Sequence, residues 1–264
     1  MAWCARIVAV LDMERLKLLG CDITASSRTE AVRAVMERLR AGSGGYVCFA
    51  NVHTVVTSNL DGATKEALNG SFMTVTDGRP IFWLARCFSK GNCEQIPGPD
   101  FLPLMVREGS KDGLRHFFLG GRAEVLEKLV GRLKALVPDI EIAGYESPPF
   151  RPLNKEETEE MLGRIRASRA DIVWIGLGAP KQEHWMHRHA ESLKPAILMG
   201  VGAAFDFHAG VIKRAPAIFS GLGLEWFYRL CQEPRRLWRR YLVTNSVFIY
   251  LVMKDILRRV QSRT

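Results

Sequence analysis

The sequence predicts an α/β fold built on a doubly wound parallel sheet. Segments with strand character alternate along the chain with segments of helical periodicity, which is typical of such folds. The segments 172–175 and 196–199 are almost wholly apolar, as expected of strands that helices cover on both faces. From Phe219 onward the chain becomes aromatic and basic. We therefore expect a Rossmann-like core at residues 1–218 and a helical, basic C-terminal appendage at 219–264.

The first elements of the core are a capped helix and a buried strand. Ser27 and Glu30 form a Ser-x-x-Glu capping box, which is typical of a helix start. The apolar residues after it share one helical face: Val32, Val35, Met36 and Leu39. A strand is expected at 46–50, and it ends at Asn51.

The later elements repeat this alternation. A strand at 117–119 runs into a Gly-Gly pair, and an amphipathic helix follows. Another strand is expected at 140–145, and the Pro-rich segment 147–152 forms a loop. Asn154 is positioned to cap the helix that precedes the two apolar strands.

Glycines follow both apolar strands, where each strand turns toward a helix. Gly176 and Gly178 follow the first, and Gly200 and Gly202 follow the second. Such turns let a phosphate approach backbone N–H groups and a helix N-terminus. The first turn is not a dinucleotide motif, because Lys181 stands in place of the third glycine. Each turn alone fits an ordinary tight loop equally well, but two together favour a nucleotide site at the carboxyl ends of the strands.

Two aspartates allow a structural and a functional interpretation. Asp77 lies in a Thr-Asp-Gly sequence, which suits a simple turn. It also suits a carboxylate at a strand end that takes a proton from a hydroxyl. Asp100, in a Gly-Pro-Asp sequence, either caps the following helix or binds a sugar hydroxyl.

Histidines crowd one expected helix. His184 and His187 are three residues apart, and Glu191 lies one turn further along the same face. This spacing suits a metal site, but any charged helix face produces it as well. With no second ligand cluster in the sequence, we expect a helix face and no metal site or cofactor.

The charge of the chain predicts an anionic partner. The net charge is +9 and the pI is about 9.4, which fits nucleic acid, a phosphorylated small molecule or an acidic membrane. Residues 219–264 hold nine basic and three acidic residues, a net charge of +6. Trp226, Trp238 and Tyr241 alternate there with arginines, a combination that favours a membrane surface over nucleic acid. A packed helix with a solvated arginine face stays as the structural alternative.

Cysteine use and hydropathy predict a cytoplasmic protein. The six cysteines form no Cys-x-x-Cys pair, and the N-terminus has no convincing signal peptide. No segment reaches the roughly 20 apolar residues that span a bilayer. We therefore expect a peripheral protein on the inner face of the cell membrane.

Five blocks of the sequence form a distinctive set: Trp174-Ile-Gly-Leu-Gly-Ala-Pro-Lys-Gln-Glu183, Gly200-Val-Gly-Ala-Ala-Phe-Asp206, Arg214-Ala-Pro216, Gly223-Leu-Glu-Trp-Phe-Tyr-Arg229 and Glu233-Pro-Arg-Arg-Leu-Trp-Arg-Arg-Tyr241. They resemble the WecG/TagA/CpsF glycosyltransferases, and the resemblance extends over about residues 18–242. Together they are far more specific than a single glycine turn.

The resemblance implies an inverting, metal-independent glycosyltransferase of cell-surface polysaccharide synthesis. The donor would be a UDP-sugar and the acceptor a polyprenyl-diphosphate-linked sugar. Asp77 matches the general base of the family, Asn51 its active-site asparagine, and Gln182 its donor-side turn. The appendage would close over the site. The resemblance and the turns together predict the substrate-binding residues Asp100, Gly176, Gly178, Lys181, Gln182, Gly200, Gly202, Asp206, Arg214, Arg229, Arg236 and Arg239.

The sequence also departs from the family. Gln95 stands where an arginine is common, and Phe49-Ala50-Asn51 replaces Thr-Pro-Asn. Gly78-Arg79-Pro80 replaces the Gly-Ile-Gly of mannosaminyl transferases, so N-acetylmannosaminyl, glucuronyl and hexosyl donors all stay open. A nucleotide-dependent oxidoreductase and a non-enzymatic membrane- or RNA-binding module are the alternatives from other classes. We expect no nucleic-acid partner, and a homo-oligomer is compatible with the sequence.

Overall fold

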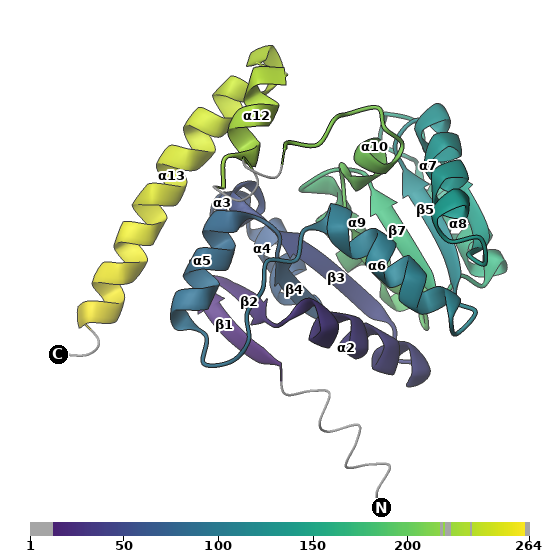
Figure 1. Cartoon of the computed structure of the whole chain (residues 1–264), viewed down its shortest axis with the longest axis horizontal. Coiled ribbons are helices and arrows are strands. Elements are labelled where there is room, and N and C mark those ends of the chain that lie inside the picture. The colour runs from purple at the N-terminus through teal and green to yellow at the C-terminus, as the bar shows by residue number, and fades with distance from the viewer. Residues whose placement is uncertain (1–12, 217–218, 220–222, 233, 262–264) are drawn as a thin grey trace, which may run out of the picture.

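The computed structural model describes residues 13–216, 219, 223–232 and 234–261 (Figure 1). A six-stranded sheet forms the centre, with strand order β4-β3-β8-β7-β5-β6 and parallel pairing throughout. Its strands are β3 (Gly45–Ala50), β4 (Met73–Thr76), β5 (Arg115–Gly120), β6 (Glu141–Glu146), β7 (Ile172–Gly176) and β8 (Ile197–Gly200). The predicted doubly wound α/β class is confirmed.

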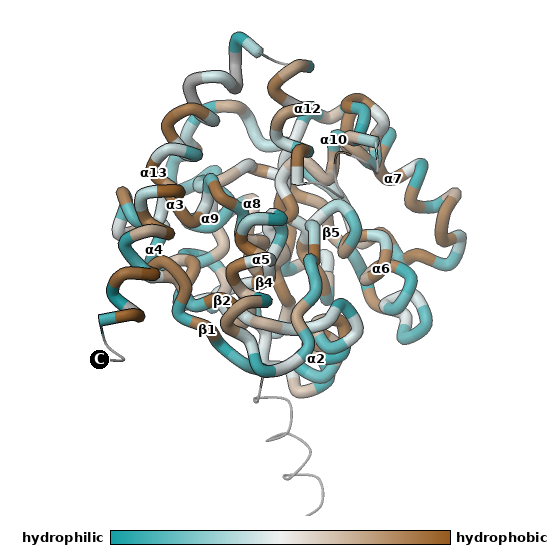
Figure 2. The backbone as a smooth tube through the Cα atoms, turned by 60° about the vertical axis from the view of Figure 1, so that its left-hand side comes forward, coloured by the Kyte–Doolittle hydropathy of each residue, from teal (hydrophilic) through white to brown (hydrophobic). Residues whose placement is uncertain are grey.

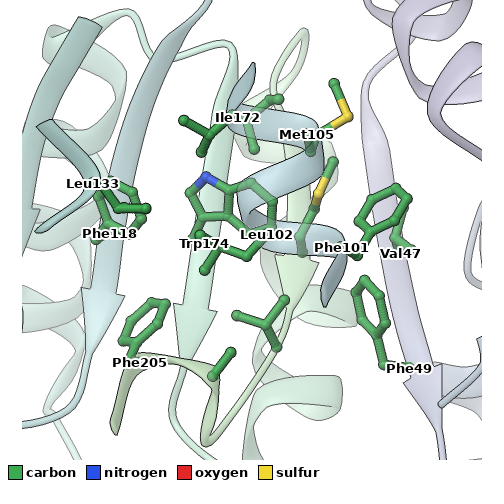
Figure 3. Close-up of a cluster of buried hydrophobic side chains, with 14 of the residues drawn as sticks. Val47, Phe49, Phe101, Leu102, Met105, Phe118, Leu133, Ile172, Trp174 and Phe205 are labelled. Carbon is green, nitrogen blue, oxygen red and sulfur yellow. The ribbon is translucent and has the colours of Figure 1, made fainter. Parts of the chain in front are cut away.

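Helices cover both faces of the sheet, because successive strand residues point to opposite sides. Ile172 and Trp174 of β7 belong to one buried cluster, and Val173 and Ile175 to the other. The first cluster includes α2 (Arg28–Arg40), α6 (Gly98–Ser110), α7 (Ala123–Leu136) and α10 (Ala204–His208). The second includes α3 (Val52–Leu60), α4 (Gly62–Asn69), α5 (Arg79–Phe88), α8 (Lys155–Ser168), α9 (Lys181–His189) and the 3₁₀ turn η1 (Glu191–Leu193). In Figure 3, Trp174 lies between Phe118 of β5 and Phe101 of α6.

The helix starts follow the predicted capping chemistry. Ser27 and Glu30 form the capping box of α2, and Asn154 forms one with Glu157 at α8. A third box, which the sequence analysis did not predict, joins Asn51 to Thr54 at the start of α3.

A two-stranded antiparallel hairpin precedes the main sheet and was not predicted. It consists of β1 (Glu14–Leu18) and β2 (Cys21–Ala25). Leu19 and Gly20 join the strands with φ angles of 51° and 81°. Positive φ at both central residues is the geometry of a tight hairpin turn. An Asn-Gly or Asp-Gly sequence would have predicted such a turn, but a Leu-Gly sequence does not.

The last two described elements are helices, α12 (Glu225–Gln232) and α13 (Pro234–Gln261). Figure 1 shows α13 running along the outside of the molecule beside α3. Its inner face carries Phe248, Leu251 and Val252, which pack on the second buried cluster, and Thr244 is buried as well. No helix among the described residues is long and apolar enough to span a membrane.

Candidate active site

A cleft of about 1600 Å³ opens at the carboxyl ends of the central strands. It is lined by the predicted residues Asn51, Asp77, Gly176, Gly178, Lys181, Gln182, Gly200, Gly202 and Asp206. Trp226 of α12 and Tyr241, Thr244 and Asn245 of α13 line it as well, so the end of the chain forms part of its wall. The fold therefore gathers residues from across the sequence at the edge where ligands bind in doubly wound sheets.

Asp77 and Asn51 meet because their strands are paired. Ala50 of β3 is in register with Thr76 of β4, so the residues that follow them emerge side by side. The Asn51 amide donates from Nδ2 to Oδ2 of Asp77 at 3.3 Å. Its other atom, Oδ1, accepts the Thr54 N–H at 3.2 Å and caps α3. The helix start thus fixes the amide, and the amide orients a half-buried carboxylate that is suited to accept a proton.

Gln95 supports Asp77 from the other side. Its Nε2 donates to the main-chain oxygen of Asp77 at 2.6 Å, and the next residue, Ile96, donates its N–H to Thr76 at 2.7 Å. A neutral side chain therefore occupies the position where the resemblance implies an arginine, and it holds the backbone of Asp77. From the sequence, Gln95 was recognised only as a departure from the family pattern. Its contact with Asp77 becomes evident only in the folded structure.

Gln182 joins the two glycine turns. Its main-chain N–H donates to the oxygen of Gly178 at 3.0 Å, and its side-chain Nε2 donates to the oxygen of Gly200 at 2.8 Å. The same nitrogen donates to Oε1 of Glu183 at 3.0 Å. Glu183 is completely buried, and this burial raises the pKa of its carboxyl to about 7. Glu183 was not predicted as a site residue, because a glutamate in the first turn of a helix is usually exposed.

The four glycines of the turns have different roles. A Cβ on Gly176 would lie 2.5 Å from the ring of Phe205, and one on Gly200 would lie 2.5 Å from the methyl carbon of Met186. Packing therefore requires glycine at 176, where the neighbour is a rigid ring, while the neighbour of Gly200 is the end of a flexible methionine side chain. Gly178 has a φ of 78° and nothing within 4 Å of a Cβ, so it alone of the four leaves open space for a ligand. Gly202, with a φ of 54°, lies against the Gln182 side chain.

Gly176→Ala should destabilise the fold by about 1–3 kcal/mol, because the added methyl overpacks against the buried Phe205. Gly131→Ala is the matched control, since this exposed glycine of α7 has nothing within 4 Å of a Cβ. The control should be neutral or stabilised by up to about 1 kcal/mol, through the better helix propensity of alanine. Urea unfolding midpoints measure both. A Gly176→Ala protein as stable as the control would contradict the packing role.

Asp100 and Arg214 bind each other beside the cleft. The Arg214 guanidinium donates to both oxygens of Asp100, from Nη1 and, at 3.1 Å, from Nη2. Arg214 also lies 3.9 Å from Glu225 of α12. The hydrogen bonds to Asp100 raise the pKa of Arg214. Burial opposes this rise, and the nearby charges of Asp100, Glu225 and Asp77 add to it. The capping interpretation of Asp100 is wrong, because Pro97 occupies the N-cap of α6.

The histidines of α9 have separate partners. His184 lies 2.8 Å from the Thr64 hydroxyl and 3.2 Å from an Asp61 oxygen, both at the start of α4. His187 instead lies 3.0 Å from the Tyr46 hydroxyl. The two rings therefore serve helix packing, and no group of three His, Cys, Asp or Glu side chains that could hold a metal occurs among the residues described.

For the appendage arginines that were predicted to bind substrate, the structure describes the helices but not the side chains. Arg229 lies on α12, and Arg236 and Arg239 lie on α13, but their side chains fall outside the described part of the structure. Trp226 and Tyr241, expected at a lipid interface, have ring centroids 5.6 Å apart and line the cleft. Trp238 is half exposed.

The sequence matches the model of the glycosyl transferase WecG/TagA/CpsF family over residues 16–262. The chain belongs to this family. It is therefore a glycosyltransferase. The alternative interpretations, an oxidoreductase and a non-enzymatic binding module, are wrong. It is also 29% identical over 204 residues to an N-acetylglucosaminyldiphosphoundecaprenol N-acetyl-beta-D-mannosaminyltransferase of Bacillus spizizenii strain W23. That match covers 77% of this chain and 77% of the relative. The predicted resemblance to the WecG/TagA/CpsF family is confirmed.

Proposed function

We propose that this glycosyltransferase transfers a sugar, with inversion, from a UDP-sugar to a polyprenyl-diphosphate-linked acceptor in cell-surface polysaccharide synthesis. The observation that carries the proposal is the Asp77 carboxylate, which Asn51 holds in the lining of the large cleft. The name of the Bacillus relative supports an N-acetylmannosaminyl donor and an N-acetylglucosaminyl-diphospho-undecaprenol acceptor.

The reaction would be a single displacement. Asp77 takes the proton of an acceptor hydroxyl, whose oxygen forms a bond to the anomeric carbon of the donor. The bond from that carbon to the UDP oxygen breaks on the opposite face, so the configuration inverts. The UDP leaves with the bonding electron pair, and the N-terminus of α9 beside Gly178 is suited to accept its negative charge.

A direct test offers purified enzyme a panel of UDP-sugars with a short-chain polyprenyl-diphospho-N-acetylglucosamine acceptor. UDP-N-acetylmannosamine should give a disaccharide product with the inverted anomeric configuration, seen by mass spectrometry and NMR. UDP-glucuronate and UDP-glucose are the competing donors. No transfer from any UDP-sugar would refute the proposal, and a retained configuration would refute the single displacement.

Transfer should continue in the presence of EDTA. Lys181, which is exposed and lines the cleft, and the N-terminus of α9 supply positive potential there without a divalent ion. We expect turnover within about twofold of the untreated enzyme. A transferase of established metal dependence serves as the control for chelation. Activity that EDTA abolishes and magnesium or manganese restores would contradict this prediction.

The outer face of α13 supports attachment to an anionic membrane. It is defined by Leu242, Val243, Ile249, Tyr250, Met253, Ile256, Leu257 and Val260, all of them exposed. These residues recur at seven-residue intervals, two helical turns, so they form one continuous stripe opposite the packed inner face. Figure 2 shows brown, hydrophobic segments recurring along this helix.

Charge favours a lipid surface as the partner of this stripe. The segment 219–264 has a net charge of +6, and Arg235, Lys254 and Arg258 are exposed on α13. An apolar stripe on a basic helix is typical of elements that lie in the plane of an anionic bilayer. The enzyme would then act as a peripheral protein on the inner face of the cell membrane, with 1–218 as the transferase core and 219–264 as its appendage.

A further inference from the structure

The buried pair of Gln182 and Glu183 is incompletely hydrogen bonded. The Gln182 amide nitrogen serves both Gly200 and Oε1 of Glu183. Oε1 of Gln182 and Oε2 of Glu183 have no partner, although both atoms are shielded from solvent. Orphaned polar atoms are rare in protein interiors and usually mark a functional or strained position. Both residues belong to the lining of the cleft.

Among the residues that the structure describes, no cation compensates a charge on Glu183. α9 packs against α4, β8, β3 and η1. β8 carries no titratable residue, and Cys48 of β3, the titratable group that faces Glu183, is kept neutral because burial raises its pKa. Among the other titratable groups of these elements, His184 contacts Asp61 and Thr64, His187 contacts Tyr46, and Glu191 pairs with Lys194. Lys65 lies close to Gly20. Glu66, Lys181 and Arg188 are exposed, and the ring of His189 packs on Trp185.

An ionised Glu183 would therefore be a buried carboxylate with one hydrogen-bond donor from a side chain. Its place in the first turn of α9 favours the charge, through the helix dipole and its own backbone N–H. Burial disfavours the charge more strongly, so burial sets the direction of the shift. A proton on Oε2 turns the orphaned acceptor into a neutral hydroxyl and removes the uncompensated charge.

We propose that Glu183 is a positioning residue that works in its neutral form, holding Gln182 across the two glycine turns, and that its ionisation weakens binding of the diphosphate donor. The coupling to the donor rests on the proposed function. A bound diphosphate brings negative charge to the turns that Gln182 joins, so it favours the neutral carboxyl. By linkage, a proton that favours donor binding is also taken up when the donor binds.

The first test needs no ligand. A carboxyl whose pKa rises from 4.5 in the unfolded chain to about 7 in the fold contributes stability below pH 4.5, and this contribution is lost as the pH rises to 7. Glu183→Gln keeps the shape and the contact with Gln182 but cannot ionise. The unfolding equilibrium constant of the wild type, relative to Glu183→Gln, should therefore rise by up to roughly 300-fold between pH 4.5 and 8.

Glu66→Gln is the matched control, because Glu66 is exposed on the neighbouring helix α4. Its stability relative to the wild type should change little over the same range. If the difference between the wild type and Glu183→Gln does not depend on pH, Glu183 is ionised in the fold and the proposal is overturned.

The second test measures donor binding by calorimetry with UDP-N-acetylmannosamine, whose diphosphate does not titrate between pH 6 and 8.5. Wild-type affinity should be roughly five- to tenfold lower at pH 8.5 than at pH 6, and binding near pH 7.5 should take up protons. Glu183→Gln should show neither effect. Equal pH dependence in both proteins would overturn the coupling. Absence of binding at every pH would instead count against the proposed donor, while the stability test still decides the state of Glu183.

Discussion

Asp77→Asn should lower kcat by roughly 10²–10⁴-fold, the range expected when a general base is lost. The amide cannot take the proton of the acceptor hydroxyl, but it has the same shape and can keep a hydrogen bond with Asn51. Asp77 follows the end of β4 and is only half buried, so this isosteric change should leave the fold unaffected. Affinity for UDP should also stay close to that of the wild type, since the glycine turns are unchanged.

The experiment combines steady-state kinetics with UDP titration and thermal unfolding. Asp112→Asn is the control, because Asp112 is an aspartate that pairs with Arg40 and does not line the cleft. It should leave kcat unchanged. A folded Asp77→Asn enzyme with turnover near that of the wild type would remove Asp77 from the role of base and return it to that of a turn residue.

Polar substitution of the outer face of α13 should reduce binding to anionic vesicles by at least ~100-fold. The variant replaces four exposed side chains by glutamine: Leu242, Ile249, Met253 and Ile256. Each apolar side chain removed from water contributes about 1.5 kcal/mol or more, so even partial insertion of four exceeds the roughly 2.7 kcal/mol that 100-fold requires. Glutamine preserves helix propensity, and the inner face stays intact.

Cosedimentation with vesicles containing phosphatidylglycerol measures this binding, and a water-soluble acceptor measures the remaining activity. A Leu60→Gln/Leu136→Gln protein is the matched control, because both leucines are exposed but lie outside α13. The outer-face variant should keep its activity on the soluble acceptor and lose it on the vesicle-borne one. Unchanged vesicle binding would refute membrane docking. A wild-type dimer that the variant dissociates would identify a second copy of the chain as the partner of this face.

The alternation of elements was predictable because it depends on local patterns. Capping boxes and apolar periodicity place α2 and α8, and continuous apolar runs place β7 and β8. The hairpin at Leu19 lacked any such pattern. Its strands are short, and their burial depends on packing against β4 and α5.

The residues of the candidate site could be predicted from the family resemblance and from the positions where strands end, but the contacts between them could not. Asp77 and Asn51 lie 26 residues apart in sequence, and only the register of β3 and β4 shows that they touch. Glu183 was out of reach for a different reason. Its burial results from tertiary packing of α9 on the sheet, and nothing in a Lys-Gln-Glu sequence indicates a side chain with no exposed surface.

The double contact of Asn51 has a consequence for protein engineering. A stability screen judges this position by the helix start alone, and there asparagine, aspartate and serine perform almost equally. Serine would shorten the side chain and release Asp77, while aspartate would set two carboxylates against each other and raise the pKa of the pair. A library selected for thermal stability would therefore retain variants at position 51 in which Asp77 is no longer held for proton transfer. Selection at position 51 has to be made on turnover.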